Sequence, residues 1–411
     1  MIERHVTNLV VELLAHMRVV CVVGARQVGK TTLVTQIAND IAPSSIVTLD
    51  NESVRSAAGS DPGGFIARMS PMAVIDEVQR APDLMLAIKE RVDTAKTPGQ
   101  FLLTGSANMM LLGTVPDTLP GRVAYVRLRA LSQSEIEGRR SSLIDSLFDG
   151  KAPDVQVAEH GIQPYLDRII SGGYPEAIEM PDQIRNRFFQ GYVNSLVNRD
   201  VDDVARVSSH HNLQRVLKLV AARSAGVLNV TAVGRDVGID DKTARRYVHL
   251  LEGLFLIERL PAWSRNINKR QTKMPKVVVS DTALLAHLTG INAARLRDDM
   301  EGRLVGSFFE TFAVNELAKL ADLATAPVEL FHYRDRDDRK IDLILERHDG
   351  DLVAIEVKAS ATVRPSDFRH SDFLAKAVGE QLRAAVVLYA GKTTVQFGPR
   401  KFAIPLAALW R

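Results

Sequence analysis

The stretch GARQVGKTT, residues 24–32, decides how the first part of this chain folds. It follows the apolar run VVCVV (19–23), and its spacing is a glycine, four residues, a glycine, a lysine and a threonine. In such a loop the glycines let the backbone curl so that successive amides face phosphate oxygens, and the helix that begins near Lys30 adds its positive N-terminal end. We therefore predict a strand, a phosphate-binding loop and a helix, in that order.

The loop predicts a nucleoside triphosphate with Mg²⁺ as its ligand. Lys30 is expected to contact the β and γ phosphates, and the hydroxyl of Thr31 is expected to coordinate the metal ion. The predicted cofactor-binding residues form one continuous run: Gly24, Ala25, Arg26, Gln27, Val28, Gly29, Lys30, Thr31 and Thr32.

A second motif, AVIDEVQ (73–79), supplies the acidic groups that nucleotide hydrolysis needs. Asp76 follows three apolar residues of an expected strand, so it is placed to bind the metal ion. Glu77, the next residue, is the candidate general base for the attacking water. Taken alone, an Asp-Glu pair at a strand end is commonly a solvated turn, and it is the phosphate loop that favours the catalytic interpretation.

A third motif, FLLTGSAN (101–108), ends an apolar run with polar side chains at Thr104, Ser106 and Asn108. One of these side chains could orient the attacking water or sense the γ phosphate. The three residues are alternatives, and we choose Ser106 as the catalytic one.

The first part of the chain has the pattern of a parallel sheet with crossover helices. Apolar runs with β character at 46–50, 73–77 and 101–106 alternate with helical segments. Apolar residues within 2–17 recur at helical spacing, so an amphipathic helix is expected before the first strand. We therefore predict an α/β fold class, with a P-loop domain at 1–130.

Length and composition exclude several classes of protein. A chain of 411 residues is too long for one ordinary core, so several domains are expected. The apolar fraction of 46% is ordinary for globular protein, and no run approaches the roughly 18 apolar residues of a membrane span. The N-terminus does not resemble a secretory signal, so we expect a cytoplasmic protein without a membrane partner. A net charge of +3 means that any basic surface must be local.

Four motifs in this order resemble the AAA+ ATPases, in particular a prokaryotic family in which this domain is fused to a C-terminal nuclease-like domain: GARQVGKTT, AVIDEVQ, FLLTGSAN and LPGRVAYVRLRALSQSE (119–135). The resemblance implies ATP hydrolysis, with ATP and Mg²⁺ as cofactors. It also implies that Arg122 serves as an arginine finger or second sensor, within its own chain or across a subunit interface. If Arg122 acts across an interface, the protein is a homo-oligomer. Arg26 also matches the family pattern.

The middle of the chain has helical patterns and one recognisable motif. Residues 131–225 are expected to form a helical connector or lid. Within 231–260, a short helix, a turn at Gly238 and a second helix capped by Asp240 or Asp241 precede a β-like end. This is the arrangement of a winged helix-turn-helix, and we place that domain at 226–275.

Basic residues in this domain predict contact with DNA. The second helix leaves basic side chains available to a major groove, and the segment 259–280 holds six basic residues and no acid. The alternatives are that the winged helix serves as a lid or a subunit contact and that the basic run is a solvated loop. The predicted nucleic-acid contacts are Lys242, Arg245, Arg246, Lys269, Arg270 and Lys273.

Two apolar runs near the C-terminus, KIDLIL (340–345) and LVAIEV (352–357), predict a β-hairpin. Alternate apolar residues of the two strands should face one core. If the strands are antiparallel neighbours, this requires an odd number of loop residues, and a loop at 347–351 satisfies the condition. The residues expected to share that core are Ile341, Leu343, Leu345, Val353, Ile355 and Val357.

In this register Asp342 lies opposite Glu356, and Lys358 lies two residues further along the same face. Opposed carboxylates repel each other unless a cation lies between them. We therefore predict that Asp342 and Glu356 bind Mg²⁺ or Mn²⁺, and that Lys358 stabilises an attacking hydroxide or the phosphorane charge.

The pattern of an Asp followed by Glu-x-Lys on a hairpin resembles the PD-(D/E)xK nuclease fold. That resemblance implies a restriction-endonuclease-like α/β domain, here at 276–411, with a glutamate on a preceding helix. In GRLVGSFFETFAVNELAKL (302–320) the family spacing points to Glu310 as a catalytic residue. Glu316 is the alternative, because it falls in the middle of an apolar helix face and needs a partner there. Lys340 departs from the pattern, since family members often carry another acid there.

Two functions follow from these motifs. The first is an ATPase that binds DNA and carries a metal-dependent nuclease-like domain. The second is a nucleotide-controlled regulatory or DNA-binding switch with a catalytically inactive nuclease-like domain. In the second case Lys358 pairs with Asp342 and Glu356 in a structural network.

Overall fold

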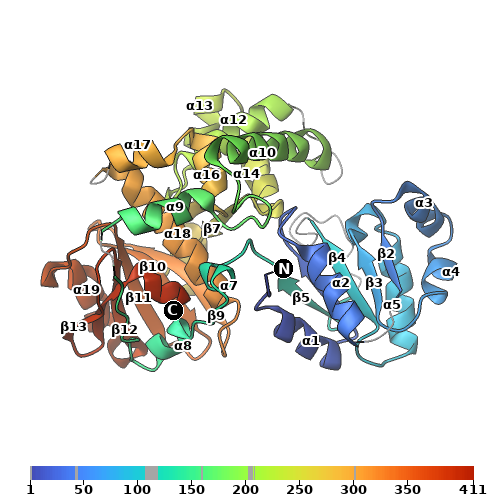
Figure 1. The fold of residues 1–411 in the computed structure, drawn as a ribbon, viewed down its shortest axis with the longest axis horizontal. Helices are drawn as coiled ribbons and strands as arrows, with labels where there is room; N and C mark the ends of the chain where they lie inside the picture. The colour runs from blue at the N-terminus through green and yellow to red at the C-terminus, as the bar shows by residue number, and fades with distance from the viewer. Residues whose placement is uncertain are drawn as a thin grey trace.

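The computed structural model describes residues 2–41, 45–106, 119–158, 161–201, 207, 209–299 and 302–411. The described strands form a five-stranded, a six-stranded and a three-stranded sheet. In Figure 1 the blue N-terminal sheet and the red C-terminal sheet lie on opposite sides of the molecule, and the green and yellow helices of the middle part lie above them. Across the described ranges, no helix is both long enough and apolar enough to cross a lipid bilayer.

The N-terminal sheet is parallel and has the strand order β2-β3-β4-β1-β5. Three of its strands, β1, β3 and β4, are buried along their whole length, as expected for a sheet covered on both faces. The four strands predicted from apolar runs are confirmed, whereas β5 has no counterpart among the predictions. The strands are β1 (Val19–Val23), β2 (Ile46–Thr48), β3 (Ala73–Asp76), β4 (Phe101–Gly105) and β5 (Val123–Arg127).

The connections between these strands place the polar motifs at one edge of the sheet. In a parallel sheet all carboxyl ends meet at the same edge. The phosphate loop follows β1, Asp76 ends β3, and Ser106 follows β4, so the three motifs meet there. The helices of this part are α1 (Thr7–His16), α2 (Lys30–Ile41), α3 (Glu52–Ser60), α4 (Pro62–Ala67), α5 (Leu84–Thr94) and the short 3₁₀ helix η1 (Val78–Arg80).

The middle part contains the predicted pair of helices and a small antiparallel sheet. The first helix, α13 (Val230–Val237), ends at Gly238, which adopts a φ of 81°. Asp240 caps the second helix, α14 (Asp241–Gly253), by accepting a hydrogen bond from the Thr243 amide. The sheet has the order β6-β8-β7, with β6 at Gly226–Val227, β7 at Ile257–Leu260 and β8 at Lys276–Val279.

Further helices surround this pair and sheet. Apart from α15, the longer of these helices have buried apolar residues that pack on their neighbours, and α12 packs on both α13 and α14. They are α9 (Gln163–Ser171), α10 (Asp182–Ser195), the π-helical turn η2 (Leu196–Asp200), α12 (His210–Ala221), α15 (Ile267–Thr272), α16 (Thr282–Thr289) and α17 (Ala293–Asp298).

The C-terminal sheet is mixed and has the order β13-β14-β12-β11-β10-β9. The pairs β11-β12 and β12-β14 are parallel, and the remaining pairs are antiparallel. Helix α18 packs on one face and α19 on the other. The elements are α18 (Arg303–Ala321), β9 (Val328–Arg334), β10 (Lys340–Arg347), β11 (Leu352–Lys358), η3 (Pro365–Phe368), α19 (Arg369–Val378), η4 (Gly379–Gln381), β12 (Leu382–Tyr389), β13 (Val395–Gly398), β14 (Lys401–Pro405) and η5 (Leu406–Trp410).

The predicted hairpin register is confirmed. Leu343 pairs with Ile355 and Glu346 pairs with Leu352, which is the register that the prediction requires. One expectation about its faces is wrong. A β-bulge between Ile341 and Ile344 shifts the pairing of β10 with β9, and Ile341 joins the apolar cluster on the α19 face instead of the cluster around α18.

Several segments lie outside the units to which the sequence assigns them. Helix α8 (Leu143–Phe148) packs on β11 and β12, and residues 155–157 pair with the loop before β13. Figure 1 shows α8 beside the C-terminal sheet, so part of the expected connector 131–225 belongs to that sheet. The short helix α7 (Gln133–Ile136) precedes α8. Conversely, β8 lies in the middle sheet, although the predicted boundary assigns its residues to the C-terminal domain.

Candidate functional site

The two glycines of the phosphate loop are needed for different reasons. A Cβ on Gly24 would lie 2.1 Å from the Leu128 carbonyl oxygen, so only glycine lets the loop approach the backbone after β5. Gly29 adopts a φ of 95°, which disfavours any other residue. The loop conformation therefore depends on both positions of the motif.

Lys30 lies over the loop and has an exposed fraction of only 5%. Its Nζ donates hydrogen bonds to the carbonyl oxygens of Gly24 (3.1 Å) and Ala25 (3.0 Å). Burial lowers the pKa of Lys30, and the nearby carboxylates of Glu77 and Asp76 offset only part of this effect. A bound phosphate would supply the negative charge that stabilises the ammonium in this position.

Three hydroxyl groups surround the Asp76 carboxylate at the end of β3. Thr31 Oγ1 donates to Oδ1 at 3.0 Å, and Thr104 Oγ1 donates to the same oxygen at 2.5 Å. Thr48 Oγ1 lies 3.3 Å from Oδ2. The Thr31 hydroxyl and the Asp76 carboxylate are neighbouring oxygen ligands of the kind that Mg²⁺ prefers, so these residues fit the predicted metal ion.

Glu77 is linked to Ser106 through Gln79. The Gln79 side-chain amide donates to Glu77 Oε2 and to Ser106 Oγ, the latter at 3.0 Å. Burial raises the pKa of Glu77, but Lys30 and the Gln79 hydrogen bond outweigh it and leave the pKa below its usual value. The carboxylate is therefore ionised and able to accept a proton.

The structure gives different partners to two of the three polar residues that end the third motif. Thr104 contacts Asp76, whereas Ser106 belongs to the Glu77 group. Asn108 lies outside the described residues. Gln79 is not among the predicted site residues, although it is part of the quoted motif AVIDEVQ.

The remaining loop residues differ in what they offer to a ligand. The side chains of Ala25 and Val28 are buried, so these residues present only backbone groups. Gln27 and Thr32 are exposed, and Gln27 has a φ of 61°. The charge of Arg26 lowers the pKa of both Lys30 and Glu77.

Arg122 lies at the opposite edge of the sheet from the phosphate loop. It precedes β5, and its carbonyl accepts a hydrogen bond from Val19, the first residue of β1. Its guanidinium pairs with Asp93. The full length of β1 therefore separates Arg122 from the loop of its own chain, which is incompatible with a sensor role within one chain.

Two other arginines lie at the carboxyl end of β5 and link all parts of the chain. Arg127 Nη2 donates to Glu258 Oε1 on β7 at 2.6 Å, and Arg129 contacts the same oxygen. Arg129 Nε also donates to Asp322, after α18, at 2.5 Å. Burial lowers the pKa of Arg127, whereas Asp322 and Glu258 outweigh burial at Arg129 and raise its pKa. No sequence motif predicts this network.

The Arg4 side chain contacts the backbone of the phosphate loop. Its guanidinium donates to the carbonyl oxygens of Val28 and Arg129, both at 2.7 Å, and to Glu135 Oε1 at 3.0 Å. Glu135 in turn closes the capping box of α7 with Ser132. Nothing in the local sequence pattern marks Arg4, because all its partners are distant in the chain.

The predicted DNA contacts fall into two groups. On α14, Lys242, Arg245 and Arg246 are exposed, and Arg245 pairs with Asp241 of the same helix. On α15, Lys269 is exposed, whereas Arg270 is half-buried.

Much of the basic segment packs on the C-terminal sheet instead of facing solvent. Arg270 donates to both carboxylate oxygens of Glu346, and Trp263 donates to Glu346 Oε1 at 3.2 Å. Lys273 Nζ donates to the Arg334 carbonyl oxygen at 3.0 Å. Arg270 is thus engaged by Glu346, whereas contact of Arg270 and Lys273 with DNA stays a prediction.

The carboxylates predicted for the C-terminal site lie around a lysine that the sequence assigns to the basic segment. Lys276 Nζ donates to Glu310 Oε1 at 2.5 Å and lies 3.4 Å from Asp342 Oδ1. Asp342 Oδ2 accepts a hydrogen bond from the Val357 amide at 3.0 Å. The expected network of Lys358 with Asp342 and Glu356 is absent from the described contacts, since Lys358 pairs with Asp367 at 3.1 Å.

The charges in this cluster act strongly on one another. Burial and the Asp342 charge raise the pKa of Glu310 to about 7 and that of Glu356 to about 8. Burial alone would lower the pKa of Lys276, but Glu310 and Asp342 outweigh it and raise the pKa. The lysine therefore stays charged and neutralises part of the cluster.

The alternative glutamate on α18 has a different environment. Glu316 is 1% exposed, pairs with Lys319 at 2.7 Å and accepts a hydrogen bond from the Gln133 amide at 2.8 Å. It thus fixes α7 to α18, and it is Glu310 that lies beside Asp342.

The C-terminal cluster does not fit a divalent metal as it is arranged. Among the described residues, no group of three or more His, Cys, Asp or Glu side chains could hold a metal ion. The ammonium of Lys276 lies against both Glu310 and Asp342, where a metal ion would need their oxygens.

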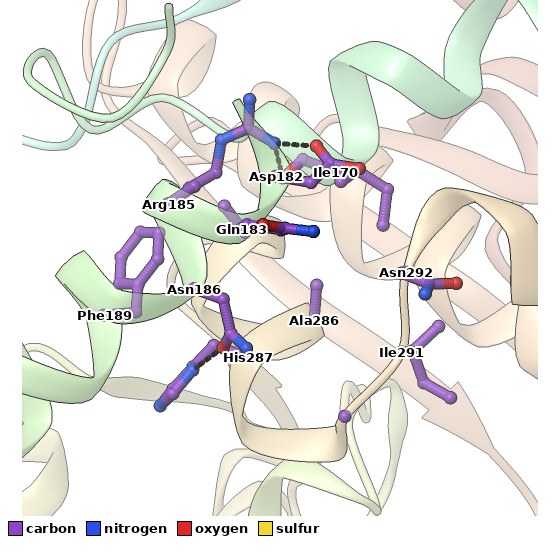
Figure 2. A pocket seen from close by; sticks show the side chains of 12 residues that line it. Ile170, Asp182, Gln183, Arg185, Asn186, Phe189, Ala286, His287, Ile291 and Asn292 are labelled. Carbon is purple, nitrogen blue, oxygen red and sulfur yellow. Dashed lines mark hydrogen bonds and ion pairs between the residues drawn. The ribbon is translucent and has the colours of Figure 1, made fainter. Parts of the chain in front are cut away.

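A separate cavity of about 220 Å³ lies in the middle part, between α9, α10 and α16. Figure 2 shows that two polar side chains lining the cavity contact other residues of the protein. Arg185 points to Asp182 and Ile170, and His287 points to Asn186. None of the predicted site residues lines this cavity.

Comparison with known proteins identifies the N-terminal part. Residues 16–137 match the family model of an AAA domain. With the parallel sheet and the phosphate loop, this match makes the N-terminal part an AAA-type P-loop domain. Residues 162–295 match a domain of unknown function, DUF8612, and residues 305–409 match another, DUF4143.

Two uncharacterized proteins and a solved structure are also similar to this chain over much of its length. An uncharacterized protein of Mycobacterium tuberculosis is 28% identical over 388 residues, which cover 94% of this chain and 80% of that protein. An uncharacterized protein of Haemophilus influenzae is 22% identical over 302 residues, 68% of this chain and 71% of that protein. The Walker-type ATPase of Pyrococcus abyssi aligns at 13% identity over 70% of this chain and 96% of that chain, with a TM-score of 0.43.

Proposed function

We propose that this chain hydrolyses ATP at its N-terminal domain and binds DNA through its middle part. The observation that best supports hydrolysis is the meeting of Lys30, Asp76 and Glu77 at one edge of the parallel sheet, with Lys30 Nζ 4.0 Å from Glu77 Oε1. The match of residues 16–137 to an AAA domain supports the same activity.

Each group has a proposed role in hydrolysis. Lys30 exchanges the carbonyl oxygens of the loop for the β and γ phosphates. Thr31 and Asp76 hold Mg²⁺, which supplies charge neutralisation at the phosphates when it is bound. Glu77 accepts a proton from the attacking water, and Gln79 fixes its carboxylate relative to Ser106.

The test of this proposal is ATP turnover by Lys30→Ala. We expect turnover to be abolished while the circular dichroism spectrum and unfolding midpoint stay close to those of the wild type. Lys96→Ala, at an exposed lysine of the same domain, is the matched control and should keep full turnover. Unchanged turnover in Lys30→Ala would show that the loop is not the hydrolytic site.

For DNA binding, the proposed surface is the exposed side of α14 with the exposed part of α15. Lys242, Arg245, Arg246 and Lys269 are exposed there, and basic side chains on such a helix pair are suited to contact the phosphate backbone and the major groove. The helix pair with its small sheet supports a winged helix-turn-helix.

Arg122 has a proposed role only between copies of the chain. Because it lies at the far edge of its own sheet, an arginine-finger role requires the phosphate site of a neighbouring copy. The expected homo-oligomer is the arrangement that would supply this site. Location in the cytoplasm stays a prediction.

For the C-terminal domain, we propose a nuclease-like fold that recognises DNA or senses a ligand without cutting. The observation that favours this function is the pairing of Lys276 with Glu310 and Asp342, together with that of Lys358 with Asp367. The alternative is metal-dependent cleavage by Glu310, Asp342, Glu356 and Lys358, which the register of β10 and β11 favours.

Plasmid nicking distinguishes the two functions of the C-terminal domain. Supercoiled plasmid is incubated with the full chain and Mg²⁺ or Mn²⁺, with and without ATP, and wild type is compared with Lys358→Ala. We expect no nicking by either protein while ATP is still hydrolysed. Nicking by the wild type that Lys358→Ala lacks would establish the nuclease instead.

A further inference from the structure

We propose that Lys276 is the resident cation of the C-terminal carboxylate cluster, and that the middle part of the chain thereby occupies the place where a nuclease-like fold would bind a divalent metal. This inference rests on the proposed function of the C-terminal domain as a site that does not cut. It concerns the cluster of Glu310, Asp342 and Glu356, with Lys276 as a member supplied from outside the domain.

The position of Lys276 is fixed by its strand. It begins β8, the central strand of the three-stranded sheet, and pairs with Val227 on one side and Leu260 on the other. Its side chain leaves this sheet and reaches the C-terminal cluster, where the residue is 8% exposed. A lysine held on both sides by backbone pairing keeps its ammonium in one place at little further cost in conformational entropy.

The ammonium uses the oxygens that a metal ion would need. It donates to Glu310 Oε1 at 2.5 Å, and it lies 3.3 Å from the Asp342 carbonyl oxygen and 3.4 Å from Asp342 Oδ1. The other carboxylate oxygen of Asp342 accepts the Val357 amide. Both carboxylate oxygens of Asp342 are thus engaged by donors of the protein, and a cation entering here would have to displace Lys276.

No other basic side chain takes this role in the described part of the cluster. Lys358, which the sequence places on the same face as Glu356, is drawn to Asp367 on η3. Among the described contacts none joins Lys276 to Glu356, on which the charges of Lys340 and Lys358 act instead. The ammonium of Lys276 therefore serves the two carboxylates of Glu310 and Asp342.

The segment that precedes Lys276 anchors it to the C-terminal sheet. Ala262 forms a parallel bridge with His332, and the amide of Trp263 donates to the His332 carbonyl at 2.6 Å. Arg270 pairs with Glu346 on β10. A metal ion bound at the cluster would therefore compete with the contacts of the Lys276 ammonium, which this docked segment holds in place.

Mn²⁺ binding to the full chain tests the inference. Metal-stripped protein without nucleotide is titrated with Mn²⁺, and binding is followed by electron paramagnetic resonance. The Mn²⁺ binding of each protein is compared with that of the same protein carrying Asp342→Asn. Mn²⁺ bound elsewhere, at Asp76 for example, is the same in both and drops out of the difference. Lys276→Met removes the charge and keeps the length of the side chain, and Lys376→Met, at an exposed lysine on α19, is the control.

We expect Asp342-dependent Mn²⁺ binding in Lys276→Met, and none in the wild type or in Lys376→Met at Mn²⁺ concentrations up to about tenfold above the Kd of Lys276→Met. Equal Asp342-dependent binding in the wild type and Lys276→Met would overturn the inference, because Lys276 would then move aside freely. If Lys276→Met does not fold, Lys276→Arg and the wild type still decide, since both should lack Asp342-dependent binding.

The two proposals about this domain fail in different experiments. Asp342-dependent Mn²⁺ binding by the wild type without plasmid nicking would overturn the role of Lys276 and leave the non-cutting function standing. Nicking that needs no divalent metal would overturn the non-cutting function and leave Lys276 as the resident cation.

Discussion

The Arg4 guanidinium donates a 2.7 Å hydrogen bond to the Val28 carbonyl oxygen inside the phosphate loop. A second hydrogen bond of the same length reaches the Arg129 carbonyl oxygen just after β5. Arg4 thus joins the segment before α1, the loop and the end of β5 through one side chain. Because the loop must hold its amides in a fixed arrangement to bind phosphate, this contact bears on nucleotide affinity.

Replacing Arg4 should therefore weaken nucleotide binding. We expect Arg4→Ala to lower the affinity for a fluorescent ATP analogue on the order of tenfold, since one hydrogen bond from a charged group contributes about 1.5 kcal/mol or more. Arg4→Lys should recover only part of the affinity, because an ammonium cannot reach three acceptors in the same geometry. Arg140→Ala, which removes an exposed ion pair with Glu3, should leave affinity unchanged. Equal affinities in Arg4→Ala and Arg140→Ala would contradict this role.

Glu77→Gln should separate ATP binding from ATP hydrolysis. The amide cannot accept the proton of water, whereas Lys30, Thr31 and Asp76 still hold the nucleotide, so we expect turnover to fall at least ~100-fold with little change in affinity. Steady-state phosphate release and analogue binding measure the two quantities. Glu90→Gln, at an exposed glutamate of α5, is the control. A parallel loss of affinity and turnover would assign Glu77 to binding instead.

The network around Glu258 should make stability depend on pH in the acidic range. Burial alone would raise the pKa of Glu258, but Arg127 and Arg129 outweigh it and lower the pKa to about 2, from the usual 4.5. A carboxyl group whose folded pKa is lowered stabilises the fold above its unfolded pKa, and this contribution is lost as the pH falls toward the folded value.

Glu258→Gln should accordingly lower the free energy of unfolding at pH 7 by roughly 2 kcal/mol, somewhat less than for a fully buried ion pair because the arginines are partly exposed. The difference from wild type should shrink as the pH falls from 4.5 toward 2, which urea unfolding at several pH values can follow. A difference that does not change with pH would argue against the ion pairs as its source.

Two neighbouring basic residues on α15 should respond differently to substitution. Lys269 is exposed, so Lys269→Ala should weaken DNA binding, reduce its salt dependence by about one counterion and leave stability unchanged. Arg270 forms an ion pair with Glu346. Arg270→Ala should therefore lower the unfolding midpoint, because the Glu346 carboxylate loses its positively charged partner. Fluorescence anisotropy with labelled duplex DNA at several salt concentrations measures the first effect. If Lys269→Ala leaves the salt dependence unchanged, α15 does not contact DNA.

The features that could be predicted from the sequence are those with local signals. The phosphate loop has a fixed spacing, and fully apolar runs mark β1, β3 and β4. The register of the hairpin follows from alternation of apolar residues, and this is why the pairing of Leu343 with Ile355 could be derived without any structure.

Features that depend on distant partners could not be derived in this way. The bulge that turns Ile341 to the other face arises from pairing with β9, whose register the hairpin pattern does not contain. Lys276 reads as one more member of a basic run, since its partners Glu310 and Asp342 follow far along the chain. Arg122 matches a family motif, but only the strand order shows at which edge of the sheet it lies.

Helix α8 has a consequence for how the protein is made. Its apolar residues leave the ribosome well before β11 and β12, the strands on which they pack. The nascent chain must therefore carry this helix without its packing partner through synthesis of the whole middle part, a state that favours capture by a chaperone over early folding. The strands of the N-terminal sheet all emerge before α8 does, whereas the C-terminal sheet is covered only when segments from two distant parts of the chain have met. A fragment that begins at Gly302 would lack α8 and expose the strand face that α8 covers.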